Sequence, residues 1–61
     1  MNRKQYFDTI SPGLGSALRE LLKHVEQLGW EFPDACYKVA TKHGFMVEEL
    51  RRAYDDYFDA D

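Results

Sequence analysis

The chain has 61 residues and a formal net charge of −3. A chain of this length forms one domain and buries only roughly 60% of the surface that its unfolded form exposes, so we expect its many aromatic side chains to supply much of the buried area. The single cysteine excludes an intrachain disulfide and a cysteine-based zinc site. No stretch of about 18 consecutive uncharged apolar residues is present, which predicts a soluble cytoplasmic protein without membrane contact.

The first predicted element is a short helix over residues 3–9. Asn2, followed three residues later by Gln5, can cap its N-terminus with a side-chain oxygen. We expect Tyr6 or Phe7 to pack this helix against the rest of the domain. The sequence Ser-Pro-Gly at residues 11–13 then interrupts the helix, because proline lacks a backbone donor and glycine relaxes the backbone.

The second element is a helix over about residues 14–28. A start at Pro12, in the first helical turn, or at Ser16 as the N-cap is an alternative to the expected start at Leu14. Gly29 is expected to end the helix in a left-handed conformation. Its apolar residues recur every three or four positions and predict the main supply of core, namely Leu14, Ala17, Leu18, Leu21, Leu22, Val25 and Leu28.

Two more helices are predicted over about residues 33–43 and 47–58. Pro33 opens the first, where a missing N–H has no cost, and Gly44 closes it. Met46 stands where a capping side chain is usual before the second, and the lack of that cap costs on the order of 1 kcal/mol. The apolar stripe of the last helix consists of Val47, Leu50, Tyr54, Tyr57 and Phe58.

Together these elements predict an all-α fold, a compact three-helix bundle preceded by the short N-terminal helix. The last two helices have a helix-turn-helix pattern. Two helices that cross steeply need small or apolar residues at their contact and a glycine in the turn, and this chain has them at Val39, Ala40, Gly44, Phe45, Leu50 and Ala53. The expected core is Leu18, Leu21, Leu22, Val25, Val39, Ala40, Leu50 and Tyr54.

Such a pattern also occurs in DNA-binding regulators, and this is the alternative function. Arg51 and Arg52 on the last helix, with Lys38 and Lys42 on the helix before it, are the candidate contacts to nucleic acid. The last helix carries more acidic than basic residues, however. Neutralisation of phosphates by Lys and Arg supplies most non-specific affinity for DNA, so its charge disfavours this interpretation.

The segment Leu28-Gly29-Trp30, with the helix after it and the later sequence Val-Glu-Glu-Leu at residues 47–50, resembles the ubiquitin-associated (UBA-like) three-helix module. The resemblance covers residues 17–58 and differs in the loop residues and in one inserted turn residue. It implies a protein-binding module whose contacts are Leu28, Gly29, Trp30 and the end of the last helix. The small size is also similar in style to accessory proteins of phage or mobile elements.

Trp30, Phe32 and Met46 lie at or near turns, where apolar side chains are harder to bury, and they are candidates either for capping the core or for anchoring a partner. The candidate partner-binding charges are Asp55, Asp56 and Asp59, with Asp61 beyond them. Acidic residues at a helix C-terminus oppose the helix dipole, so stability does not explain them. An attraction for a protein partner with a basic surface does.

Catalysis has little support in the sequence, and we expect neither an enzyme nor a cofactor. Cys36 and His43 are seven residues apart on one predicted helix, about 10 Å along its axis, which is beyond the reach of proton transfer. The C-terminal aspartates lack the glycine-turned loop of a calcium site. His24 is expected at the surface and His43 at the edge of the core, with neither binding a metal.

Overall fold

In a computed structural model, residues 2–60 are described and form four α-helices, α1 (Arg3–Tyr6), α2 (Pro12–Glu26), α3 (Phe32–His43) and α4 (Val47–Asp59), with a 3-10 turn η1 (Phe7–Thr9) after α1. These residues contain no strand, so the predicted all-α class is confirmed. None of the helices in the described range combines the length and the apolar character needed to span a bilayer.

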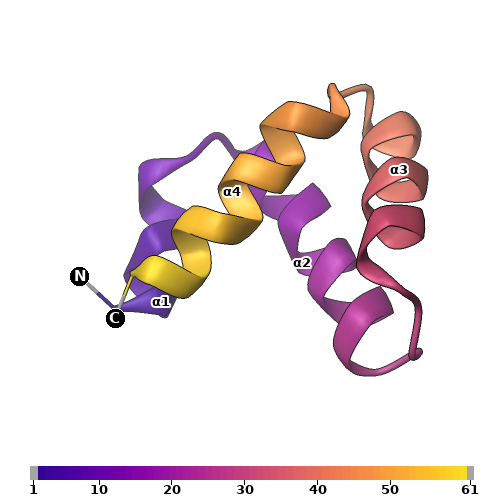
Figure 1. Cartoon of the computed structure of the whole chain (residues 1–61). Coiled ribbons are helices and arrows are strands. Elements are labelled where there is room, and N and C mark those ends of the chain that lie inside the picture. The colour runs from indigo at the N-terminus through magenta and orange to yellow at the C-terminus, as the bar shows by residue number, and fades with distance from the viewer. Residues whose placement is uncertain (1, 61) are drawn as a thin grey trace.

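The helices surround one core (Figure 1). The chain reverses direction between α2 and α3, which lie side by side and share the most extensive contact. Helix α4 packs on both of them, and its C-terminal half extends to α1. The termini of the described chain therefore lie close together, at the end of the molecule away from α3 (Figure 1).

Small side chains dominate the buried core. Four of its ten apolar residues are alanines, and a fifth is Cys36. Since the distance between two packed helices depends on the side chains at their contact, these residues let the helices approach closely. The other five members are Tyr6, Leu18, Leu21, Val39 and Leu50.

The larger aromatic side chains form a row around this core. The ring of Phe32 on α3 lies 4.6 Å from that of Tyr54, which lies 4.8 Å from Phe58, measured between centroids. The row continues from Phe58 to Tyr57 at 5.1 Å and from Tyr57 to Phe7 at 5.5 Å. It thus joins the start of α3 to the N-terminal segment through α4.

This arrangement corrects part of the predicted core. Tyr54, Leu22 and Val25 pack against the core but remain partly exposed. The contact positions of α4 belong to Leu50 and Ala53 instead, because a tyrosine between closely spaced helices would force them apart.

The predicted helix boundaries need three corrections. Helix α2 begins at Pro12 and not at Leu14, because the Ser11 hydroxyl caps it by accepting the N–H of Leu14 at 3.2 Å. It ends at Glu26 and not at residue 28. The expected helix over residues 3–9 is α-helical only to Tyr6 and continues as η1, while the predicted cap between Asn2 and Gln5 is present in both directions at 2.8 and 3.1 Å.

The turn between α3 and α4 is fixed by Gly44, whose φ of 77° is accessible mainly to glycine. Backbone N–H groups of Gly44 and Phe45 donate to the carbonyls of Thr41 and Ala40, which completes a Schellman ending. Across the turn, the Glu49 carboxylate accepts the N–H of Met46 at 3.3 Å, so the missing side-chain cap at Met46 is partly replaced.

His24 is buried, which corrects its predicted place at the surface. Its Nδ1 lies 2.9 Å from the carbonyl oxygen of Glu20, and because a carbonyl can only accept, Nδ1 must carry a proton. The imidazole contacts the Trp30 ring edge to face at 5.2 Å. The histidine thereby fills the end of the α2–α3 contact.

Glu20 ties α2 to the C-terminal end of α3. Its carboxylate accepts from Lys42 Nζ at 3.0 Å and lies 3.2 Å from His43 Nε2. The hydrogen bonds from Lys42 and then from His43 hold the pKa of Glu20 below its ordinary value.

Leu21→Ala should lower the free energy of unfolding by roughly 2–5 kcal/mol, because the Leu21 side chain is fully buried and its loss leaves a cavity. Urea denaturation followed by circular dichroism measures this difference. A variant as stable as the parent would show that α2 does not supply the core in the described way.

Glu20→Gln should reduce the loss of stability that occurs as the pH falls. A carboxyl group whose pKa is lowered by folding stabilises the protein above its ordinary pKa of 4.5, and this contribution is lost as the pH falls through the lowered value. The pair with Lys42 is largely solvated, so we expect a contribution of at most about 1 kcal/mol. Thermal unfolding between neutral and acid pH should show less acid destabilisation in Glu20→Gln than in the parent or in the control Glu26→Gln.

Candidate functional site between α3 and α4

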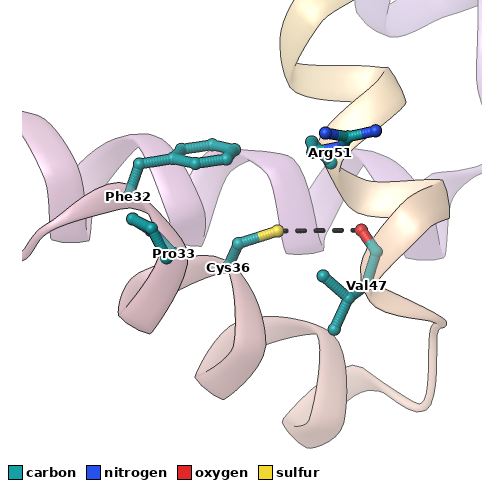
Figure 2. Close-up of a pocket in the computed structure, with 5 residues that line it drawn as sticks. All are labelled: Phe32, Pro33, Cys36, Val47 and Arg51. Atoms are coloured by element: carbon teal, nitrogen blue, oxygen red, sulfur yellow. Dashed lines mark hydrogen bonds between the residues drawn. The ribbon is translucent and has the colours of Figure 1, made fainter.

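A groove of about 300 Å³ opens between α3 and α4 (Figure 2). We call it the α3–α4 groove. Phe32, Pro33 and Cys36 come from the first half of α3, and Val47 and Arg51 from the first half of α4. Its walls are mostly apolar, with the Arg51 guanidinium at the rim (Figure 2).

Cys36 forms the floor of the groove and joins its two walls. Its side chain is only 1% exposed, and the thiol points at the carbonyl oxygen of Val47, with an Sγ–O distance of 3.7 Å (Figure 2). Burial raises the pKa of the Cys36 thiol, so the neutral form predominates at neutral pH. His43 lies 3.2 Å from Glu20 and is not placed beside the thiol as a base.

A second depression, of about 420 Å³, lies further along α4 and is lined by Tyr54, Asp55, Phe58 and Asp59. We call it the acidic hollow. The contact between the Phe32 and Tyr54 rings connects it to the α3–α4 groove. On α4, the residues lining both depressions recur every three or four positions, so both lie on one side of that helix.

The predicted aspartates of α4 lie at the surface. Asp55, Asp56 and Asp59 are exposed, and none forms an ion pair with another of residues 2–60. The nearby guanidinium of Arg3 lies over the Phe58 ring, 4.7 Å from its centroid. Asp61 lies outside the described residues. Among residues 2–60 no cluster of three potential ligands could hold a metal ion.

The structure separates the three predicted apolar anchors. Phe32 lines the α3–α4 groove, and Met46, 68% exposed, directly precedes Val47 at the groove's other end. Trp30 belongs to the α2–α3 loop, where it contacts His24 and lies 5.4 Å from Lys38 Nζ. Trp30 precedes α3 and Met46 follows it, and because the 12 residues of α3 span about 18 Å, the two side chains lie at opposite ends of that helix.

Two of the four candidate nucleic-acid contacts form ion pairs within the chain, and the other two lie beside aromatic or acidic side chains. Lys42 pairs with Glu20 at 3.0 Å, and Arg51 pairs with Glu48 at 3.1 Å. Lys38 lies over the Trp30 ring. Arg52 shares a shallow hollow with acidic side chains, namely Glu48, Asp55 and Asp56. A phosphate would have to compete with these groups.

The sequence alone did not identify Pro33, Cys36, Val47 and Tyr54 as parts of a surface site, whereas Phe58 belongs to the helix end that the UBA-like resemblance indicated. Val47, Tyr54 and Phe58 belong to the predicted apolar stripe of the last helix. The large number of apolar residues in that stripe was the one sequence feature that could have indicated a surface site. Five large apolar residues are more than one side of a short helix can bury in so small a domain.

The chain matches no protein-family model, no curated protein and no solved structure. We therefore infer its function from the geometry of the α3–α4 groove and the acidic hollow.

Trp30→Ala should lower the stability more than Met46→Ser does. Removal of Trp30 loses its edge contact with His24, which should lower the free energy of unfolding by about 0.5–1.5 kcal/mol or more. Met46 is mostly exposed, so its replacement should stay within about 0.5 kcal/mol of the parent. Paired denaturation curves test this, and a larger loss for Met46→Ser would assign Met46 to the core.

Proposed function

We propose that this chain is a small, non-enzymatic protein-interaction module that binds a basic surface of a protein partner through the acidic end of α4 and the adjoining aromatic residues. The observation that carries the proposal is the difference between the two kinds of charge. Two of the four candidate basic residues, Lys42 and Arg51, form ion pairs within the chain, whereas Asp55, Asp56 and Asp59 have no ion-pair partner among residues 2–60.

The position of these aspartates supports a role in binding. Asp56 and Asp59 lie in the last turn of α4, where the helix dipole is already negative and each acidic residue is unfavourable by about 0.3–1 kcal/mol, and Asp55 directly precedes them. No basic residue is present in the last turn of α4 to offset them. A negative field at this end instead speeds association with a positively charged partner.

The shape of the site supports a macromolecular partner. Small-molecule sites are typically about 300–1,000 Å³ and enclose most of the ligand. The α3–α4 groove is at the lower end of this range and open to solvent, so it suits an anchoring side chain that projects from a larger surface.

We interpret α2, α3 and α4 as a UBA-like three-helix bundle, with a helix-turn-helix-like corner at Gly44 that serves protein binding. A cytoplasmic accessory protein of phage type, acting on a host or cognate protein, fits the size of the module. A DNA-binding regulator that uses Arg51, Arg52, Lys38 and Lys42 is the competing function.

Selection of peptides from a displayed random library against the immobilised protein should enrich sequences rich in Lys and Arg that also contain a large apolar residue. For these peptides, the triple variant Asp55→Asn, Asp56→Asn, Asp59→Asn should lower the association rate roughly tenfold at low salt and reduce its salt dependence. Stopped-flow measurements at low and physiological ionic strength give both quantities.

Enrichment of neutral or acidic peptides, or an unchanged association rate in the triple variant, would refute the proposed partner class. Mixed-sequence duplex DNA serves as the comparison ligand. We expect no binding of the parent protein to DNA at low salt, whereas affinity near micromolar that falls steeply with salt would favour the regulator.

A further inference from the structure

We infer that the α3–α4 groove and the acidic hollow together receive one amphipathic helix of the partner, with an apolar anchor over Cys36 and basic residues about two turns further along the same side. This inference rests on the proposed function, because it specifies the form in which the basic partner is recognised. Three features of the described residues carry it.

The first feature is that residues 2–60 present no sheet edge. Residues 2–60 contain no strand, so a partner has no sheet edge there to extend. The α3–α4 groove lies between two helices, and such grooves accept an amphipathic helix through apolar residues spaced three or four positions apart.

The second feature is length. Val47 at one end of the site and Asp59 at the other are twelve residues apart on α4, which corresponds to about 18 Å. A partner helix of about three turns covers this distance. The ring contact between Phe32 and Tyr54 makes the apolar lining continuous along the way, so an anchor and a basic side chain of one helix can be engaged together.

The third feature is the order of the charges along the site. At the groove, Arg51 is balanced by Glu48 at 3.1 Å, so the apolar walls have little net charge beside them. In the hollow, Asp55 and Asp59 are one turn apart and form no ion pair among residues 2–60. The complementary helix is therefore apolar at one end and basic at the other.

The same charges disfavour a second copy of this chain as the occupant. In a symmetric dimer, the acidic hollows of the two copies would lie on the shared interface, and like charges there oppose association. The net charge of −3 acts in the same direction.

Two helical peptides of identical composition test the inference directly. Both are built on alanine and glutamine. In the aligned peptide, two leucines lie one turn apart. Two arginines lie on the same side of the helix, starting about two turns after the leucines. In the misaligned peptide, the arginines lie on the opposite side. Fluorescence anisotropy should show the aligned peptide binding about tenfold more tightly than the misaligned one.

Matched variants locate the binding. The double variant Asp55→Asn, Asp59→Asn should weaken the aligned peptide about tenfold, and Val47→Thr, which keeps the shape of the side chain, about threefold or more. The control Asp8→Asn, Asp34→Asn removes the same number of charges outside the residues lining the site, and Tyr37→Ala removes an exposed aromatic outside it. Neither control should change the affinity by more than about twofold.

The outcomes separate the inference from the proposed function. Equal binding of the two peptides that still depends on Asp55 and Asp59 would overturn the helix-in-groove mode and leave the basic partner class intact. No binding of either peptide would refute both. An equal loss of affinity in the control variants would show binding to net charge alone, and dimerisation that blocks the aligned peptide, measured by sedimentation, would assign the site to a second copy.

Discussion

The close approach of α2, α3 and α4 through small side chains is the constraint on which the rest of this molecule depends. Ala17, Ala35, Ala40 and Ala53 are at most 2% exposed and occupy contact positions, with Leu18, Leu21 and Leu50 filling the space between them. A domain of this length has little interior volume, so closely spaced helices are an effective way to exclude water from it. The close spacing of the helices also leaves little room for aromatic rings in the core.

The candidate site follows from that exclusion. The rings of Phe32 and Tyr54 pack at the edge of the core and stay partly exposed, and Phe58 contacts the Tyr54 ring. Between Phe32 and Val47 the edge leaves a groove whose floor is Cys36, a small residue of the core itself. The packing that stabilises the domain therefore also exposes a strip of apolar surface, and exposed apolar strips bordered by unpaired charge are typical of binding surfaces.

Local signals in the sequence were sufficient for the secondary structure. The predicted cap at Asn2, the glycine ending at Gly44 and the helix over residues 33–43 agree with the structure, because each depends on neighbours in the chain. The start of α2 was predicted wrongly at Leu14, with Pro12 and Ser16 as alternatives, and the Ser11 side chain caps the helix so that it begins at Pro12.

The site was harder to predict because it depends on rotation of the helices about their axes. The helix-turn-helix spacing indicated Leu50 and Ala53 as contact residues, and both are buried. Periodicity also places Val47 and Tyr54 on the apolar side of the last helix, but it does not say that they line surface depressions. His24 was assigned to the surface for the same reason, although its ring fills the space beside Trp30. Charge was more informative, since the acidic excess after residue 45 is visible in the sequence and lies beside the groove.

The central claim is that the α3–α4 groove and the acidic hollow act as one binding surface. Titration of ¹⁵N-labelled protein with the aligned helical peptide tests it most directly, because backbone amide shifts report where the peptide lies. The account predicts the largest changes at Cys36, Val47, Arg51 and Asp55. Changes concentrated at Trp30 and the α2–α3 loop, with the groove unaffected, would contradict it.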